Sequence, residues 1–399
     1  MPIQVYLDSS DYSKLTDPRG VSDQLLSIKE RLLSWSKSGE VTFRFSAAHI
    51  IEMSPVESKA EHAAEARAEF LSELCGLNTL IPFDELTLAE LKRYASNEPN
   101  LKIDAYSDKG NWFPSLGEGI FSVLGEDRLS PSNFLPKLEG LSRDARRKAE
   151  REIFKNGKLR EEAKRKILAE ADDAIRAILA QFPMRKQDAD VLVRYMVGDA
   201  TKAKADNAFY ASLRDPNWMM QWFRNQRDPM MPIIEWLRAP ARRLQASMVT
   251  ASNASQQLRK VYKDNGSNSI PPELSAKARE EMRLRWLQSI SISIMEAKQV
   301  AAPPFDLTRI QDLAPGFCTG ISVSNDTLWA SASENPRESM PSDFVDAVHS
   351  MYAPYVDVYR TDAFMTPLVS KYVKSRGTVV VGKITSLIET IEFCLQRPR

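Results

Sequence analysis

The chain has 399 residues, of which 43% are apolar, and its 54 basic and 53 acidic residues leave a formal net charge of +1. This length corresponds to two or three domains with a sizeable core, and the balanced charge excludes global electrostatic steering of a polyanion. Three widely separated cysteines exclude a disulfide framework, and the lack of an apolar run of membrane-spanning length excludes a membrane span. With no signal-like start, these features predict a soluble, cytoplasmic protein.

Residues 1–95 alternate between strand and helix patterns. The predicted strands cover residues 3–7, 41–45 and 77–82, and the predicted helices cover 21–36, the segment that follows the N-cap candidate Ser46, and 60–75. Such an alternation is typical of a parallel α/β sheet.

The middle of the chain, from about residue 96 to 335, is mostly helical in pattern. Residues 142–182 predict one long helical stretch, with a break at Asn156-Gly157. Within it, Arg143–Lys166 holds eleven Lys or Arg against five Asp or Glu, an excess of six. Such a stretch is by default a solvated helix face. Its functional interpretation is a phosphate-contacting RNA surface formed by Arg146, Arg147, Lys148 and Arg151.

An aromatic cluster follows at Trp218, Trp222 and Phe223. These rings could stack on bases, but the methionines around them favour a core or a face that binds a protein partner or a second copy of the chain.

The end of the chain returns to the α/β pattern, with a helix over 343–352, strands over 355–359 and 378–381, and a closing helix over 384–395. We therefore predict one parallel-sheet α/β domain built from residues 1–95 and 341–399. A large helical insertion, residues 96–340, interrupts it.

Acidic residues recur where these strands end. Asp8 follows the first strand, Asp362 follows the strand near residue 359, and Glu52 lies on the helix after the second strand. Asp343 and Asp346 are three residues apart, so they share one face of the helix that leads into the Asp362 strand. Because the carboxyl ends of parallel strands meet at one edge of a sheet, we expect these carboxylates to converge.

Converging carboxylates repel each other unless a cation lies among them. Oxygen ligands of this kind suit Mg²⁺ or Mn²⁺, which can activate a water and stabilise displacement at phosphorus. The acids therefore indicate phosphodiester hydrolysis.

Three stretches, VYLDSSDYSKL, FSAAHIIEM and SDFVDAVHSMYAPYVDVYRTDAFM, resemble in this order the acidic motifs of PIN-domain nucleases. The resemblance covers about 155 residues, at 1–95 and 340–399, and leaves the insertion outside. It implies a PIN-like parallel-sheet fold and a Mg²⁺- or Mn²⁺-dependent ribonuclease acting on single-stranded RNA, in a toxin, RNA-processing or defence setting. The acids it implies are Asp8, Glu52, Asp346 (or Asp343) and Asp362.

Several candidates also have a structural interpretation. Asp8 and Asp343 are good helix N-caps, which makes Asp346 the preferred third ligand and Asp343 its supporter. Ser9, His349 and Thr361 could orient a carboxylate or a water from outside the ligand set, or serve as turn, cap or core residues.

Three other interpretations of the same residues exist. A haloacid-dehalogenase-type phosphatase needs a second acid two positions after the first, whereas Asp11 is three positions after Asp8. The segment Gly377–Lys383 matches a P-loop only in letters, because its middle residues are themselves the predicted strand. An inactive scaffold that binds a partner through the helical insertion stays open as the alternative to a nuclease.

Overall fold

The structure is a computed structural model. It describes residues 2–54, 61–96, 98, 100–113, 144, 154–155, 158–169, 171–180, 184–216, 218, 227–266, 271–340 and 342–397. The chain divides into two compact units: residues 1–54, 62–114 and 237–399 form the first, and residues 55–61 and 115–236 form the second. Residues 237–340, which we expected in the insertion, therefore belong to the unit that holds both chain ends. Across the described ranges, no helix is both long and apolar enough to cross a membrane.

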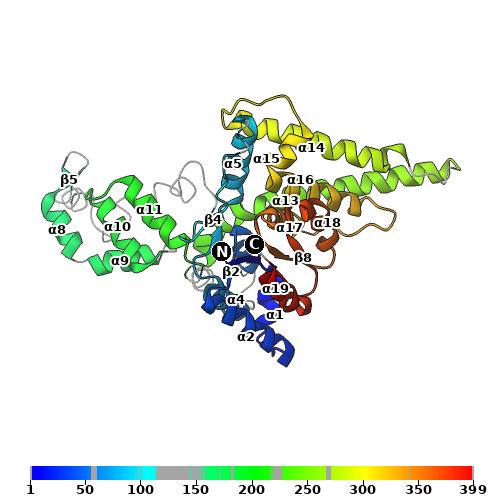
Figure 1. Ribbon diagram of the computed structural model, residues 1–399. Coiled ribbons are helices and arrows are strands. Elements are labelled where there is room, and N and C mark those ends of the chain that lie inside the picture. Colours follow the sequence, from blue (N-terminus) through cyan, green and yellow to red (C-terminus); the bar gives the residue numbers. More distant parts are fainter. Residues whose placement is uncertain are drawn as a thin grey trace. The chain divides into compact units, whose positions relative to one another are not determined.

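A four-stranded parallel sheet joins the two ends of the chain (Figure 1). Its order is β2-β1-β7-β8, with β1 at Ile3–Tyr6, β2 at Val41–Arg44, β7 at Val358–Arg360 and β8 at Val379–Val381. In the centre, Val5 of β1 is paired with Phe43 on one side and Val358 on the other. The expectation of a parallel α/β sheet built from both chain ends is confirmed.

The third predicted strand has a different partner. β3 (Thr79–Leu80) pairs antiparallel with β4 (Tyr106–Ser107), and only one bridge, Phe45 to Thr79, links it to the end of β2. The buried Arg44 guanidinium reinforces this junction by donating to the Thr79 carbonyl at 3.1 Å and lying over the Tyr106 ring. The 77–82 segment is thus shorter than predicted and lies outside the four-stranded sheet.

Helices cover both faces of the sheet. The first unit contains α1 (Ser9–Leu15), α2 (Asp23–Ser38), α3 (Ala47–Met53), α4 (Glu61–Cys75), α5 (Phe83–Ser96), α14 (Ala276–Ala297), α15 (Leu307–Leu313), α16 (Pro315–Ser331), α17 (Asp343–Met351), α18 (Met365–Val373) and α19 (Leu387–Gln396). Short 3₁₀ turns occupy η4 (Pro272–Leu274), η5 (Ala353–Tyr355), η6 (Lys374–Arg376) and η7 (Ile384–Ser386). α19 contacts β1, β7 and β8 as well as α2, which packs on β2. In Figure 1, α2 and α19 lie on one side of the sheet, and α17 and α18 lie on the other.

The second unit departs from the predicted long helix. Residues 142–182 include an antiparallel pair, β5 (Phe154–Lys155) with β6 (Lys158–Leu159), followed by two helices, α8 (Glu161–Ala169) and α9 (Ala171–Leu179). The strands flank the predicted break at Asn156-Gly157, a dipeptide that favours tight hairpin turns. α10 (Lys186–Met196) and α11 (Lys202–Leu213) follow, while α13 (Arg227–Asp264) runs from this unit into the first.

Two glycines let α16 approach α17, the helix that carries Asp346 and His349. A Cβ atom at Gly316 would lie 2.6 Å from the Met351 carbonyl oxygen, and one at Gly320 would lie 2.5 Å from the Met351 Cγ. Since real Cβ atoms do not come this close, the approach of the two helices requires glycine at 316, where the contact is with backbone, whereas a side chain at 320 would require Met351 to move.

A buried glutamate holds the start of α16. Glu90 of α5 accepts hydrogen bonds from the backbone N–H groups of Gly316 at 2.7 Å and Phe317 at 2.6 Å, and from the Tyr355 hydroxyl. Two otherwise unpaired donors of the helix N-terminus are satisfied in this way. Burial raises the pKa of the Glu90 carboxyl to about 7, although these three hydrogen bonds lower it.

We expect Gly316→Ala to destabilise the protein more than Gly320→Ala. The first substitution forces a methyl group against a backbone carbonyl, whereas the second meets a flexible methionine side chain that can move. Overpacking of this kind costs about 1–3 kcal/mol, against a gain of up to about 1 kcal/mol from replacing a helical glycine. Urea unfolding of both variants measures the difference, and an equal or reversed order would contradict the close approach at Gly316.

The raised pKa of Glu90 predicts a pH dependence of stability. Between about pH 4.5 and 7 the folded state keeps a proton on Glu90 that the unfolded state releases, so the unfolding free energy falls as the pH rises through this window. Glu90→Gln carries no such proton, so its stability should lack this decline, which we expect to be on the order of 1–3 kcal/mol. Urea unfolding at several pH values tests this, with the exposed Glu98→Gln as the charge control. Parallel pH profiles for wild type and Glu90→Gln would contradict the assignment.

Candidate acidic site at the sheet edge

Two aspartates from opposite chain ends occupy equivalent places at the carboxyl edge of the sheet. Asp8 lies two residues after β1 and Asp362 two residues after β7. Asp8 Oδ1 accepts from the Ser10 N–H, and Asp362 Oδ1 accepts from the Met365 N–H, both at 2.7 Å. The N-cap of α1 is therefore Asp8 itself rather than Ser9 or Ser10. Neither Oδ2 atom makes a hydrogen bond to any residue that the structure describes, so each aspartate retains an oxygen for another partner.

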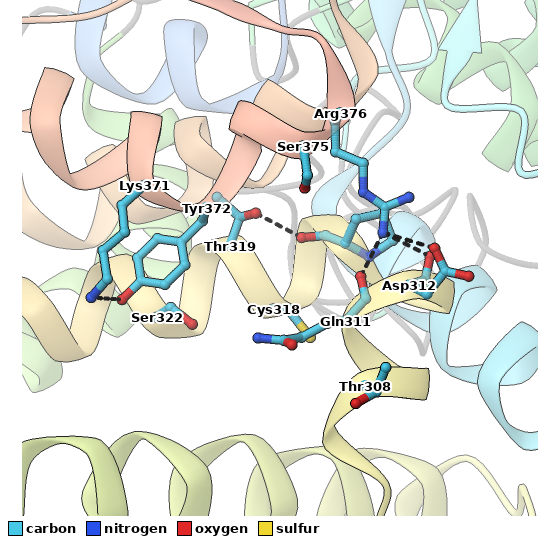
Figure 2. Close-up of a pocket in the computed structure, with 11 residues that line it drawn as sticks. Thr308, Gln311, Asp312, Cys318, Thr319, Ser322, Lys371, Tyr372, Ser375 and Arg376 are labelled. Atoms are coloured by element: carbon cyan, nitrogen blue, oxygen red, sulfur yellow. Dashed lines mark hydrogen bonds and ion pairs between the residues drawn. The ribbon is translucent and has the colours of Figure 1, made fainter. Parts of the chain in front are cut away.

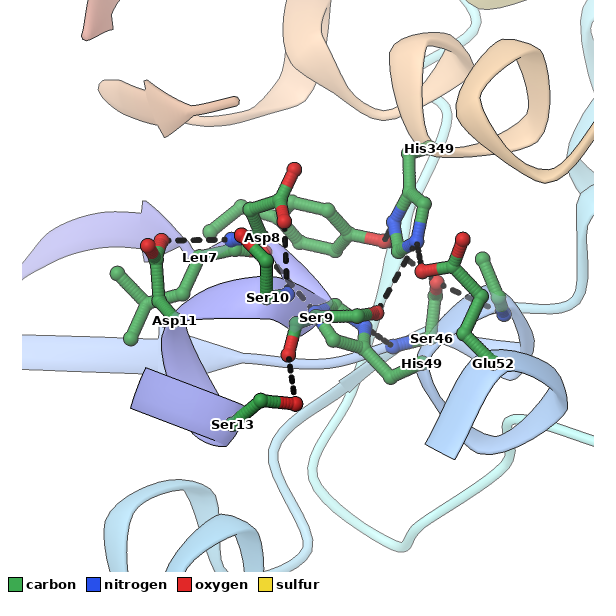
Figure 3. Close-up of polar contacts among 12 residues, drawn as sticks. Leu7, Asp8, Ser9, Ser10, Asp11, Ser13, Ser46, His49, Glu52 and His349 are labelled. Atoms are coloured by element: carbon green, nitrogen blue, oxygen red, sulfur yellow. Dashed lines mark hydrogen bonds and ion pairs between the residues drawn. The ribbon is translucent and has the colours of Figure 1, made fainter. Parts of the chain in front are cut away.

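Glu52 and His349 form a carboxylate–imidazole pair at the same edge (Figure 3). Glu52 lies on α3, and its Oε2 is 3.1 Å from Nε2 of His349 on α17. The Ser9 hydroxyl lies 3.4 Å from the same nitrogen. Ser9 and His349, two of the residues predicted to orient a carboxylate from outside the ligand set, thus lie next to the predicted ligand Glu52.

The Tyr6 hydroxyl connects this pair to the core. It lies 2.6 Å from the Ser46 Oγ and 2.6 Å from the His349 Nδ1, in a fully buried position. If His349 Nε2–H donates to Glu52, Nδ1 must accept from Tyr6, and Tyr6 in turn accepts from Ser46. Ser46 Oγ already accepts from the Ala48 N–H at 3.3 Å, so the chain of donors runs in one direction toward Glu52.

A second histidine has a purely structural set of partners. His49 Nδ1 accepts from the Ser46 N–H at 3.1 Å, so its Nε2–H donates to the Leu7 carbonyl oxygen at 2.9 Å. Burial, together with neighbouring His349, holds the pKa of His49 well below its usual value. His49 is therefore a neutral residue that ties α3 to the end of β1.

The charge of each of the other acids at this edge affects the pKa of Asp346. Burial raises its pKa well above the usual value, and the charges of Glu52, Asp8, Asp362 and Asp343 raise it further. Tyr359, which stacks on Tyr6, has its pKa raised by burial and then by Asp8, Asp346, Glu52 and Asp362. The charges of Asp8, Glu52 and Asp362 thus act on both Asp346 and Tyr359, two residues of this sheet edge, and each disfavours ionisation of Asp346.

Asp343 and Thr361 are engaged in local structure. Asp343 is buried, forms an ion pair with Arg337 at 2.8 Å and accepts from the Met340 N–H at 2.9 Å. The Thr361 N–H donates to the Val381 carbonyl, and its own carbonyl accepts from the Arg360 guanidinium. Asp343 thus anchors the loop before α17, and Thr361 anchors the end of β7 to β8.

The sequence interpretation did not identify a buried ion pair beside Asp8. Asp11 and Arg360 are both almost fully buried, and their charged atoms are 2.7 Å apart. Burial raises the pKa of Asp11 to about 6, although Arg360 lowers it. The Asp357 carboxylate accepts from the Gln4 N–H at 2.7 Å and so joins the segment before β7 to the start of β1, away from the acids.

The remaining predictions concern the basic stretch and the aromatic cluster. Arg146, Arg147, Lys148 and Arg151 fall outside the described residues, as do Trp222 and Phe223. Over the part of the chain that the structure describes, no group of three or more His, Cys, Asp or Glu side chains is arranged so that it could hold a metal ion.

Comparison of the chain with protein-family models, with curated proteins and with solved structures yields no match in any of the three.

The central tyrosines carry a signal that the sequence analysis missed. Val5-Tyr6 precedes Asp8 and Val358-Tyr359 precedes Asp362, and the register pairs Tyr6 with Tyr359. A repeated Val-Tyr before an acid at both chain ends could have placed these rings side by side.

We expect Tyr6→Phe to lower the unfolding free energy by about 1–3 kcal/mol, because Ser46 and His349 would each lose a buried hydrogen-bond partner. Tyr359→Phe is the matched control, since its hydroxyl makes no hydrogen bond to the described residues and its ring stacks against that of Tyr6. Thermal and urea unfolding provide the comparison. Equal losses in the two variants would show that the Tyr6 hydroxyl does not hold the segments together.

Proposed function

We propose that this protein is a PIN-like, Mg²⁺- or Mn²⁺-dependent nuclease that cleaves single-stranded RNA. The observation that carries the proposal is the placement of Asp8 and Asp362 two residues after the neighbouring strands β1 and β7, with Glu52 of α3 held by His349 of α17, the helix that also carries Asp346. The charges of the other three acids also raise the pKa of Asp346. Such an acidic cluster is unfavourable by itself and becomes favourable when a cation neutralises it.

By residue type the donor set suits a hard divalent cation, although in the described part of the chain these side chains do not stand in a metal-binding arrangement, so binding requires them to move together. All four candidates are carboxylates, and Asp8 and Asp362 each keep one oxygen without a hydrogen bond to described residues. Asp343 is already neutralised by Arg337, so we assign the third ligand to Asp346. A bound Mg²⁺ or Mn²⁺ would supply charge neutralisation at phosphate oxygens and a water of lowered pKa.

The protein's own residues have separate roles in this proposal. The hydrogen bonds from the Ser10 and Met365 N–H groups fix the orientation of the Asp8 and Asp362 carboxylates. The Tyr6–His349 hydrogen bond fixes the imidazole next to Glu52, which orients that carboxylate from the other side of the edge. Ser9, 3.4 Å from the same imidazole, is placed to hold a water or a substrate hydroxyl.

The ion pair at Asp11 argues against the phosphatase rival. A haloacid-dehalogenase-type mechanism needs a second acid that can exchange protons with substrate near Asp8. Asp11 is 0% exposed and is held by Arg360 at 2.7 Å and by the Asp8 N–H. It is therefore a structural capping residue of α1 and cannot reach a substrate.

The test is cleavage of end-labelled single-stranded RNA with Mn²⁺ or Mg²⁺ and with EDTA. We expect metal-dependent cleavage by wild type and a cleavage rate more than about 100-fold lower in Asp8→Asn and Asp362→Asn. A loss of this size exceeds the usual effect of removing a residue that only hydrogen-bonds to a metal ligand. Asp17→Asn is the matched control, because among the described residues that carboxylate pairs with Arg19 alone, in the loop after α1.

Two results would overturn the proposal. Cleavage that is equal in Asp8→Asn and wild type would show that the activity comes from elsewhere. Absence of both cleavage and Mn²⁺ binding by calorimetry would favour the alternative, a scaffold that acts through its helices.

A further inference from the structure

A polar pocket of about 310 Å³, lined by α15, α16, α18 and η6, holds two cations that are both paired (Figure 2). The Lys371 ammonium lies 3.4 Å from Asp326, and the Arg376 guanidinium lies 3.1 Å from Asp312. In each of these pairs at least one side chain is well exposed, so water also solvates the charges. Ion pairs of this kind contribute little to stability.

The ion pair beside Asp8 is of a different kind, because it has almost no contact with solvent. Asp11 is 0% and Arg360 is 3% exposed, and Asp11 Oδ1 accepts from Arg360 Nη2 at 2.7 Å. Arg360 Nε has no hydrogen-bond partner among the described residues, and Lys14, the other cation near Asp11, is 3.8 Å away. The desolvation of such a pair is so unfavourable that two apolar residues of similar size are often equally stable. A gain in stability therefore does not explain why this pair is present.

The pair connects the two chain segments that carry Asp8 and Asp362. On one side, Asp11 holds both backbone groups of Asp8 (Figure 3). Its Oδ2 accepts from the Asp8 N–H at 3.3 Å, and its own N–H donates to the Asp8 carbonyl at 2.9 Å. On the other side, Arg360 Nη1 donates to the carbonyl of Thr361, the residue directly before Asp362. The connection therefore runs from the backbone of Asp8 to the peptide group that precedes Asp362.

The backbone pairing of β1 with β7 ends before it reaches these acids. The last printed pair of the register is Tyr6 with Tyr359, and the two aspartates lie two and three residues beyond it, at 8 and 362. Each aspartate side chain caps its own helix, so neither reaches across to the other segment. Among the described residues, the Asp11–Arg360 ion pair is the polar contact that joins residues 8–11 to residues 360–362.

We infer that Asp11 and Arg360 are positioning residues that set the separation of the Asp8 and Asp362 main chains, and through it the affinity of the acidic edge for a divalent cation. The effect on the cation rests on the proposed function. The carboxylates have to move together before they can hold an ion. A fixed main chain leaves only side-chain rotation for that movement, so little ordering is needed when the ion binds.

Replacing both members of the pair tests the inference without leaving a buried charge alone. Asp11→Leu/Arg360→Met should remain folded, with a urea midpoint close to that of wild type. Hydrogen exchange of the metal-free, full-length protein should become at least about tenfold faster at the N–H groups of Met365 and Thr366. Both of these groups donate to Asp362, and neither donates to a replaced residue. Exchange in β2, on the other side of β1, should not change.

Calorimetric titration with Mn²⁺ provides the second measurement. In the double variant the affinity should fall by about 10–100-fold, the usual effect of removing a residue that orients a metal ligand. Arg279→Met/Asp326→Leu is the matched control and should alter neither measurement. It removes an ion pair of 2.8 Å whose carboxylate is also buried, but which joins α14 to α16.

The two measurements separate this inference from the nuclease proposal. Faster exchange at Met365 and Thr366 supports it, and so does weaker Mn²⁺ binding. Unchanged exchange, an unchanged Mn²⁺ affinity, or equal changes in the control variant would overturn it. If wild type itself binds no Mn²⁺, the nuclease proposal fails, and exchange alone decides whether the pair positions the two segments. If the double variant does not fold, Arg360→Lys takes its place, because an ammonium keeps the charge but lacks the fork that reaches both acceptors.

Discussion

The Tyr6 hydroxyl is the interaction on which the acidic edge depends. It joins three segments that are far apart in sequence: β1, the start of α3 through Ser46, and α17 through His349, which is 343 residues away. The ring adds a stacking contact with Tyr359, and the site is fully buried, so each hydrogen bond lies where an unpaired group would be costly. Because Glu52 and Asp346 belong to α3 and α17, the elements that carry both acids meet at this one side chain.

α16 and the helices packed around it fix the position of α17. Glu90 fixes the first turn of α16, and the glycines at 316 and 320 let α16 lie against α17 at a distance that larger residues would not allow. A core formed by α5, α14, α15 and α16 supports this arrangement, and it includes Tyr94, Leu287 and Phe317. The residues from 237 onward thus serve the domain formed by the chain ends rather than a separate module.

Much of this edge was predictable from the sequence because strand ends and caps leave local signals. A short apolar run followed by an acid marked Asp8 and Asp362, and Ser46 marked the start of α3. What local patterns do not encode is which residues meet across the fold. Asp11 and Arg360 are 349 residues apart, and only the register of β1 with β7 brings them together. Similarly, the pattern of 77–82 predicts a strand but not its antiparallel partner, and nothing in α16 itself shows that its glycines face Met351.

The join between β1 and β7 also has a consequence for the order of events during synthesis. Gln4 and Asp357, which pair the two strands, are 353 residues apart. A growing chain exposes its N-terminal segments first, and closing so large a loop costs more entropy than closing a short one. Until residues 343–381 have left the ribosome, β1 lacks its inner neighbour, Tyr6 lacks His349, and Asp8 lacks two of the acids that surround it. The acidic edge therefore cannot form until the C-terminal segment has emerged, and a chain that ends before Asp362 does not contain it.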